Sequence, residues 1–426
     1  MKGTHRPEEE NPGRRRLLKA AVLGGGALAL PGAVYAGQSA ASTAGTEARP
    51  HVARPLAFTH PGALHTQEAF DRMAEHVAAG DEPWLAGWNR LVANPHSAAG
   101  WTPNPQETII RGSGGSGPEN YGILYNDIHA AYQNALRWKI TGDTAHGDTA
   151  RDICNAWSET LTSIDAGPSD SRLASGIYGY QFANVGEIIR DYEGFDLVRF
   201  QDLMQNVFYP LNSDFLVRHN GTCESHYWAN WDLCNMASIM AIGILRDDQA
   251  QFDEAVDYFH DGLGTGNLMN AAPFVYDDVG LAQWQESGRD QAHSMMGIGL
   301  MGTLCEMAYS QGVDLYAADD YRFRKACEYV ARYNLGNDDV PFTTYENCEG
   351  QVHTVISEGG RGQVRPVWER VFHHYWGRLN QDCPSMREMA LANSPEGGGG
   401  DYGGTSGGFD ELGFGTLTYV DRLVSE

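Results

Sequence analysis

The sequence predicts an all-α protein, an (α/α) toroid or incomplete barrel of helical hairpins. Apolar residues recur at helical spacing through most of the chain, whereas the alternating pattern of a β-strand is scarce. Short turns rich in Gly, Pro and Asp separate these stretches, which is typical of helices packed as hairpins around one core. The expected helices cover residues 69–77, 84–92, 121–138, 150–161, 182–192, 197–207, 231–245, 255–259, 295–309 and 321–333.

The first 36 residues have the layout of a cleavable export signal. Three arginines at 14–16 precede an apolar run at 17–30, which Pro31 and Gly32 close before the small residues Val34 and Ala36 on either side of Tyr35. The arginine pair indicates twin-arginine export, and the run is shorter than the roughly 20 residues that a membrane span needs. We therefore expect a secreted or periplasmic protein that has no membrane contact once residues 1–36 are removed.

The remainder of the chain is expected to form one domain. Residues 37–55 are rich in Ala, Ser, Thr and Gly and predict a flexible leader. No low-complexity linker interrupts residues 56–345, so residues 56–426 are expected to fold together, with a Gly-rich C-terminal tail from about residue 346 that packs back onto the rest. Thr66 and Asp148 are expected to cap the helices that follow them.

Charge and cysteine content exclude several kinds of partner. The formal net charge is −25, which argues against nucleic acid, and no glycine cluster has the Lys-Ser/Thr ending of a P-loop. The seven cysteines show no metal-ligand spacing, so we expect no zinc site, no cofactor and no dense disulfide framework. Because seven is odd, at least one thiol stays free. A reduced, buried thiol such as Cys305 or Cys327 is expected, and a bridge between Cys348 and Cys383 stays open.

Polar and aromatic residues gather in four clusters. The first two clusters, at 223–232 and 283–293, each contain two polar residues four positions apart at the start of a predicted helix: His226 with Asn230, and Arg289 with His293. Side chains at this spacing share one face of a helix. Ordinary core aromatics, a capping histidine or a salt-bridged turn would be the alternatives. The members are Glu224, His226, Tyr227, Trp228 and Asn230 in the first cluster, and Trp284, Gln285, Glu286, Arg289 and His293 in the second.

The other two clusters are less acidic. The third offers a phenol and two amides, from Tyr180, Gln181 and Asn184. The fourth could supply the local positive field that an acidic chain needs to hold an anionic ligand, although a solvated basic helix face explains it equally well. Its members are Arg361, Arg365, Arg370, His374, Tyr375 and Arg378.

At these residues the sequence resembles the alginate lyase superfamily of (α/α) toroid enzymes. Residues 225–231 are similar to the Asn-Asn-His-x-Tyr-Trp signature of periplasmic mannuronate lyases, and residues 283–293 look like a block of related alginate and glucuronan lyases. The likeness covers roughly residues 56–420. It implies an enzyme that cuts an acidic, uronate-containing polysaccharide by β-elimination. Two positions depart from the family pattern, because its Asn-His pair falls on Glu224 and Ser225 and its tyrosine falls on Met296.

The elimination chemistry suggests a role for each candidate. Removal of the C5 proton of a uronate requires neutralisation of its carboxylate, for which Arg289 and Asn230 are suited, with Glu224 or Glu286 assisting if protonated. His226 is the first choice of base, His293 the second, and Tyr180 the expected acid, with Tyr227 and Tyr375 in reserve. Further substrate contacts are expected from Trp228, Gln181, Asn184, Trp284, Gln285, Arg361 and His374.

Two other classes stay open. An (α/α)-barrel glycoside hydrolase would use two carboxylates, such as Glu224 and Glu286, and a non-catalytic glycan-binding protein would show no turnover. The sequence does not name the polymer, but the resemblance ranks mannuronate-rich alginate ahead of glucuronan and of a branched acidic heteropolysaccharide. It does not decide between endo and exo action, nor the oligomeric state.

Overall fold

The structure is a computed structural model that describes residues 57–167, 170–406 and 409–423. The chain divides into residues 1–51 and 52–426, and only the second unit is described below. The predicted signal at 1–36 and leader at 37–55 lie outside the described residues.

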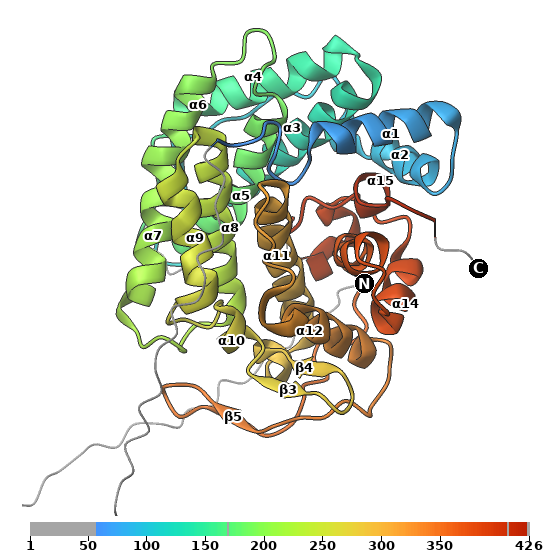
Figure 1. The fold of residues 1–426 in the computed structure, drawn as a ribbon. Helices are drawn as coiled ribbons and strands as arrows, with labels where there is room; N and C mark the ends of the chain where they lie inside the picture. Colours follow the sequence, from blue (N-terminus) through green and yellow to red (C-terminus); the bar gives the residue numbers. More distant parts are fainter. Residues whose placement is uncertain (1–56, 168–169, 407–408, 424–426) are drawn as a thin grey trace, which may run out of the picture. The chain divides into compact units, whose positions relative to one another are not determined.

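The described unit is built mainly of helices (Figure 1). Each of the ten predicted helical stretches overlaps a helix of the structure. The α-helices are α1 (Gln67–Ala79), α2 (Trp84–Ala93), α3 (Tyr121–Thr141), α4 (Thr144–Thr160), α5 (Ser171–Ile188), α6 (Leu197–Leu203), α7 (Tyr209–Arg218), α8 (Ala229–Arg246), α9 (Gln249–Asp261), α10 (Leu268–Ala271), α11 (Gln291–Ser310), α12 (Ala318–Asn334), α13 (Trp368–Phe372), α14 (Pro384–Asn393) and α15 (Gly415–Thr418). Short 3-10 and π segments are η1 (Pro95–Ser97), η2 (Met204–Phe208), η3 (His219–Gly221), η4 (Gln285–Gly288), η5 (His373–Arg378) and η6 (Gly399–Ser406).

Four long helices pack side by side in the order α3, α5, α8 and α11. Each of them also packs against a second helix that follows it in the chain. The pairs α3 with α4, α5 with α7, α8 with α9, and α11 with α12 make these contacts. Helices α5 and α8 approach closely because small residues face each other: a Cβ atom at Gly176 would collide with Cys234, and one at Gly179 with Ser238. This parallel register places the beginnings of α5 and α8 at the same end of the unit.

Two local predictions differ from the structure. Helix α5 begins at Ser171, well before the predicted residue 182, because its first half is rich in Ser, Ala and Gly and carries little apolar periodicity. Asp148 was expected to cap a helix, but α4 begins earlier, and the N-cap is Asp143, whose side chain accepts from Ala145 N. The predicted cap at Thr66 is confirmed by a hydrogen bond from Ala69 N.

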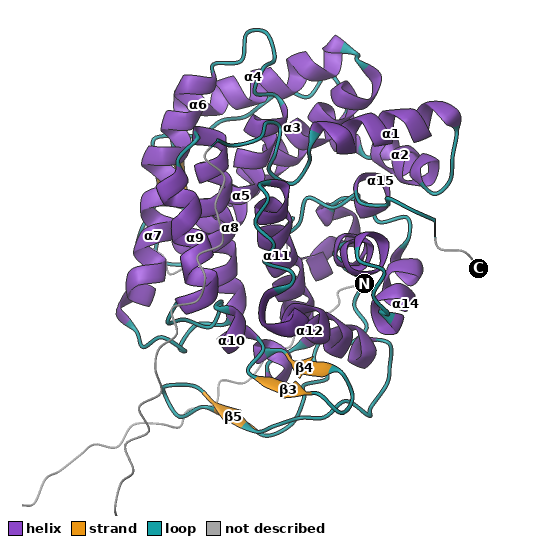
Figure 2. Ribbon diagram, viewed as in Figure 1, coloured by secondary structure: helices purple, strands orange, loops and turns teal. Residues whose placement is uncertain are grey.

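Three two-stranded sheets complete the unit. The strands β1 (Thr108–Ile109) and β2 (Ser163–Ile164) pair in parallel, whereas β3 (Phe274–Tyr276) with β4 (Leu281–Gln283), and β5 (Tyr345–Glu346) with β6 (Val352–His353), are antiparallel. Figure 2 shows β3, β4 and β5 together at one end of the unit. Because β4 leads through η4 into α11, this is the end at which α11 begins.

The C-terminal tail packs into the helical core. The hydroxyl of Tyr180 on α5 donates to the carbonyl of Asp410 over 2.6 Å, and the amide of Gln181 donates to the carbonyl of Phe409 over 2.7 Å. Arg365 forms an ion pair with Asp410 at 3.0 Å. The tail is therefore held against α5 at residues 409–410, where Asp410 is buried.

None of the helices in the described ranges is long and apolar enough to cross a membrane.

Candidate active site

A connected polar network surrounds Arg289, just before α11. Its Nη1 donates to Glu286 Oε2 over 3.0 Å, and its Nη2 lies 3.2 Å from His293 Nε2. The guanidinium also lies over the ring of Trp228, with Cζ 5.2 Å from the ring centroid. A quarter of the side chain is exposed (25%). A guanidinium held in this way is oriented to meet a planar carboxylate from its open side.

Asp290 orients His293. As the N-cap of α11, Asp290 accepts from the backbone N–H of His293 over 2.8 Å, and its carboxylate lies 2.7 Å from His293 Nδ1. Burial alone would raise the pKa of Asp290, but the hydrogen bonds from His293 outweigh it and hold that pKa below its usual range. Both ring nitrogens of His293 are thus engaged, one by Asp290 and the other by Arg289.

Glu286 and Asn230 lie beneath this network. Glu286 is fully buried and accepts from the backbone N–H of Asn230 over 2.8 Å and from its side-chain amide over 2.9 and 3.0 Å. Burial raises the pKa of Glu286, and Arg289 offsets only part of that rise. Asn230 is 1% exposed and turns its amide toward Glu286. Asn230 therefore holds Glu286, and Glu286 holds Arg289, while both Asn230 and Glu286 are buried.

A pocket of about 350 Å³ opens beside Trp228. Its walls include Tyr345, from β5, and His353, from β6, with ring centroids 5.0 Å apart; the centroid of His353 also lies 5.2 Å from that of Trp228. Gln285 and His226 contribute polar groups. Aromatic walls with a few polar groups between them are typical of a ligand pocket. Glu224, another predicted member of the first cluster, also lines it.

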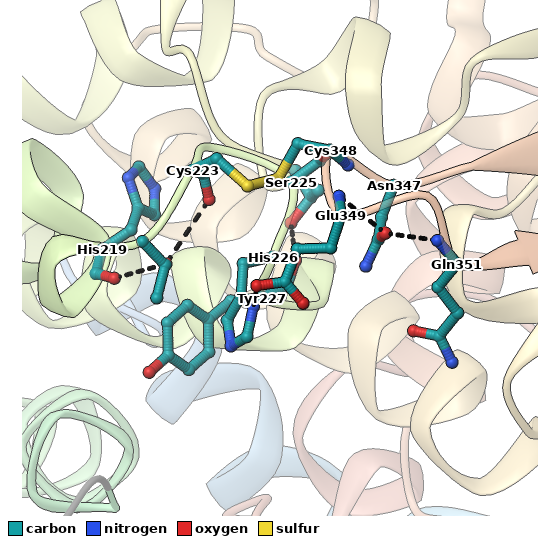
Figure 3. The surroundings of a disulfide bond; sticks show 11 residues. His219, Cys223, Ser225, His226, Tyr227, Asn347, Cys348, Glu349 and Gln351 are labelled. Carbon is teal, nitrogen blue, oxygen red and sulfur yellow. Dashed lines mark hydrogen bonds and ion pairs between the residues drawn. A yellow bond between two sulfur atoms is a disulfide. The ribbon is translucent and has the colours of Figure 1, made fainter. Parts of the chain in front are cut away.

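A disulfide between Cys223 and Cys348 joins the loop before α8 to the turn between β5 and β6 (Figure 3). The proposed alternative bridge between Cys348 and Cys383 is therefore wrong, because Cys348 already has a partner and Cys383 is free. Cys305 and Cys327 are free and buried, as predicted. Near the disulfide, His226 Nδ1 lies 2.8 Å from Glu349 Oε1.

The structure places the third cluster in the core. Tyr180 and Gln181 are fully buried and hold the tail, as described above, while Asn184 accepts from the backbone N–H of Leu64 over 2.9 Å. Burial also raises the pKa of Tyr180 well above its usual value. A phenol that is fully buried under the tail is poorly placed to protonate a substrate. The sequence grouped these residues correctly but gave no indication that the tail would cover them.

The fourth cluster does not provide a free cationic surface. Its four arginines are each paired with a carboxylate: Arg361 with Asp338 at 2.7 Å, Arg365 with Asp410 at 3.0 Å, Arg370 with Glu411 at 3.5 Å and Arg378 with Glu306 at 2.7 Å. Arg365 and Arg370 are also buried, so the alternative of a solvated basic helix face is wrong too. The sequence shows the four arginines, but it does not show that each pairs with a carboxylate that lies 23 to 72 positions away along the chain.

His374 and Tyr375 lie far from Arg289. The ring of His374 stacks on Tyr316, and the hydroxyl of Tyr375 donates to the carbonyl of Tyr316 over 3.1 Å. His374 also lies 3.3 Å from Arg378, whose partner Glu306 is thirteen residues beyond His293 on α11. At 1.5 Å per helical residue, this separation is roughly 20 Å. These residues therefore belong to the opposite end of the helix.

Two predicted aromatic contacts are also placed away from the pocket. Trp284 is fully buried and packs against Gly297 of α11. Tyr227 lies against Trp231 and Phe215, with ring centroids 4.7 and 5.1 Å away, and its hydroxyl accepts from Asn220. Both side chains make packing contacts, and neither lines the pocket.

Sequence reasoning missed the wall that β5 and β6 contribute. Tyr345 donates to the carbonyl of Gln285 over 2.5 Å and accepts from Gly288 N over 3.2 Å, which fixes it against the 283–293 segment. Burial raises the pKa of Tyr345 above its usual value, so its phenol stays protonated. One signal was available: Cys154, Cys234, Cys305 and Cys327 lie in predicted helices, whereas Cys223, Cys348 and Cys383 lie in polar stretches between them, which narrows the pairing to these three without choosing among them.

Within the described ranges, no group of three or more His, Cys, Asp or Glu residues is arranged to hold a metal ion.

The fold is that of the (α/α) toroid polysaccharide lyases. It is similar to that of alginate lyase A1-III from Sphingomonas species A1, with a TM-score of 0.51 and 15% identity over 78% of this chain and 92% of that chain. A histidine-to-alanine variant of alginate lyase A1-III in complex with a tetrasaccharide has a TM-score of 0.57 and 13% identity over 87% of this chain and 98% of that chain. An alginate lyase from Bacteroides ovatus has a TM-score of 0.53 and 13% identity, with 85% and 100% covered. These likenesses confirm the predicted helical toroid.

The chain belongs to the alginate lyase family, whose sequence profile matches residues 110–340. That range contains Asn230, Arg289 and His293, although not the β5–β6 wall. A search of curated proteins finds no match. Family membership makes the protein a polysaccharide lyase, as the sequence resemblance predicted.

Proposed function

We propose that the protein is an exported lyase that cleaves 1,4-linked uronate glycans by β-elimination, with mannuronate-rich alginate as the first substrate to test. The observation that carries this proposal is the placement of Arg289. Its guanidinium is held by Glu286 and His293 while it lies over Trp228, a wall of the pocket that His226 also lines. A fixed cation beside an aromatic pocket is what a uronate carboxylate requires for recognition.

Arg289 would neutralise the substrate carboxylate while negative charge develops on it. The C5 proton of a uronate becomes acidic enough to be removed only when that charge is stabilised. Asn230 and Glu286 contribute by holding Arg289, since the Asn230 amide faces Glu286. This assigns Asn230 a supporting role in place of the direct one that the sequence suggested.

His226 is better placed than His293 to act as the base. Among the described residues, His226 Nε2 makes no hydrogen bond, while His293 Nε2 lies 3.2 Å from Arg289 Nη2. His226 would take the C5 proton on Nε2, and the electron pair of the broken C5–H bond would form the C4–C5 double bond. The bond from C4 to the linking oxygen then breaks.

Tyr345 replaces Tyr180 as the proposed acid. The leaving oxygen needs a proton, and Tyr345 lines the pocket, whereas Tyr180 and Tyr375 are fully buried and do not line it. To act as the acid, the Tyr345 hydroxyl would exchange its bond to the Gln285 carbonyl for one to the leaving oxygen. A phenol whose pKa is raised by burial keeps its proton until the leaving oxygen demands it. The two products would be a new reducing end and a 4,5-unsaturated uronate end.

The test is a panel of polymers: polymannuronate, polyguluronate, glucuronan and a neutral glucan. The expected result is ultraviolet absorbance from the unsaturated uronate, with the greatest rate on polymannuronate. Release of reducing ends without this absorbance would show hydrolysis and overturn the proposal. The hydrolase alternative has little structural support, because Glu286 is buried and bound by Asn230 and Arg289.

Export is part of the proposal. It is supported by the arginine pair and apolar run at 14–30 and by the Cys223–Cys348 disulfide, since such bonds persist in oxidising compartments. Cell fractionation of the full chain and of a variant with Arg14 and Arg15 replaced by lysine would test it. Equal recovery of both chains outside the cytoplasm would contradict twin-arginine export.

A further inference from the structure

The turn between β5 and β6 is anchored beside His226 at several points. The disulfide from Cys223 reaches Cys348 across 125 sequence positions, and the backbone N–H of Cys348 donates to Ser225 Oγ over 2.8 Å. Figure 3 shows that these contacts bring Glu349 over His226. A covalent bond and a hydrogen bond therefore tie the turn to the residues on both sides of Glu224.

The conformation of the turn also fixes the backbone of Glu349. The side-chain oxygen of Asn347 accepts from the N–H groups of Glu349 and Gln351, both over 3.0 Å. Gly350 follows with a φ of 78°, a left-handed conformation that glycine adopts without strain. An Asx turn of this kind sets the direction in which the next side chain leaves the backbone.

The carboxylate of Glu349 lies beside one nitrogen of His226. Its Oε1 lies 2.8 Å from Nδ1. In this orientation the contact is an ion pair by distance and not an aligned hydrogen bond, and Nδ1 is buried with no hydrogen-bond partner. Because a carboxylate only accepts hydrogen bonds, a rotation of the Glu349 side chain that aligned the two groups would keep the proton of neutral His226 on Nδ1 and leave the lone pair on Nε2. Carboxylates commonly orient histidines in this way at catalytic sites.

We infer that Glu349 is a positioning residue for His226, and that the Cys223–Cys348 disulfide holds the turn in which it acts. The inference rests on the proposed role of His226 as the base. Glu349 is 55% exposed and His226 33% exposed, so water screens the pair and its contribution to stability is small. Its effect is to select one tautomer and one ring orientation.

The first test compares Glu349→Gln and Glu349→Asp with the wild type on polymannuronate. We expect kcat to fall roughly tenfold or more in Glu349→Gln, with KM changed less than about twofold, and the aspartate variant to recover part of the loss. Asp81→Asn is a matched control, since Asp81 contacts His76 Nδ1 at 2.9 Å with a similar exposure and lies outside the pocket. Wild-type kcat in Glu349→Gln would overturn the inference.

The second test does not depend on activity. Long-range ¹H–¹⁵N spectra distinguish the two imidazole tautomers, and the His226 signals are assigned by their loss in His226→Gln. We expect a protonated Nδ1 in the wild type and a mixture of tautomers in Glu349→Gln. An unchanged tautomer in the variant overturns the inference even if the protein has no lyase activity, whereas a lack of turnover with the expected spectra would count against the proposed function alone.

The third test removes the disulfide with Cys223→Ser and Cys348→Ser together. We expect kcat and the tautomer mixture to resemble those of Glu349→Gln, and the triple variant to be no worse than either parent, because all changes act through one contact. Thermal unfolding is measured alongside to separate a stability loss from a positioning loss. A double variant with wild-type kcat and tautomer at a temperature where it stays folded would overturn the part assigned to the disulfide.

Discussion

The guanidinium of Arg289 donates from Nη1 to the fully buried carboxylate of Glu286 over 3.0 Å. The same cation reaches His293 Nε2 with Nη2, so Arg289 connects a buried anion to a half-exposed histidine. A cation in this position serves two purposes. It stabilises a carboxylate that would otherwise be unpaired in the core, and it presents positive charge near the pocket wall formed by Trp228.

Arg289→Ala should therefore lose both activity and stability. Removal of one member of a buried pair leaves an uncompensated charge, which costs about 3 kcal/mol or more, and loss of a charge-stabilising donor lowers kcat by roughly 10² to 10³. Steady-state kinetics and denaturant unfolding measure the two effects separately. The double variant Arg289→Ala, Glu286→Gln should regain stability but not activity, and recovery of activity would contradict the proposed role of Arg289.

Polymer cleavage should become more efficient as salt is added from low ionic strength. The chain has a formal net charge of −25, and the four arginines of the 361–378 segment are paired with carboxylates. A polyanion approaching this surface is repelled until salt screens the field, so kcat/KM should rise roughly two- to tenfold between about 10 mM and 150 mM NaCl, mainly through KM. A fall in kcat/KM over this range would show that a cationic surface attracts the polymer after all.

The sequence predicted what is local and missed what is distant. Apolar periodicity located the long helices because each turn of a helix is encoded by residues three and four positions apart. The pairing of Cys223 with Cys348 and the burial of Tyr180 under Asp410 join segments 125 and 230 positions apart, and no periodicity records such contacts. Arg289 was identified because its neighbours in the network, Glu286 and His293, lie within four positions of it.

The tail contains a carboxyl group whose titration should affect stability. Glu411 is buried next to Arg370, and burial raises its pKa from 4.5 to about 7 despite that cation. Between these two values the folded state keeps a proton that the unfolded state has released. Stability from this group is therefore complete below pH 4.5 and is lost as pH rises toward 7, by about 3 kcal/mol in all.

Glu411→Gln removes the titration, so the stability of the wild type relative to this variant should fall across that range in urea unfolding. A constant difference between pH 4.5 and pH 7 would contradict this account.

Tyr345→Phe tests the proposed acid. The substitution removes only the hydroxyl oxygen, which donates to Gln285 O and accepts from Gly288 N. If that hydroxyl protonates the leaving oxygen, kcat should fall by roughly 10² to 10⁴, because no other group supplies the proton as the bond breaks.

Tyr276→Phe is the matched control: its hydroxyl donates to Gln283 Oε1 over 2.8 Å in the neighbouring hairpin, but it does not line the pocket. We expect the control to retain kcat within about twofold. Equal losses in both variants would mean that the tyrosines act only through the packing of the hairpins, and the acid would then have to be sought elsewhere on the pocket wall. The two variants also separate chemistry from binding, since loss of a proton donor lowers kcat while KM stays close to that of the wild type.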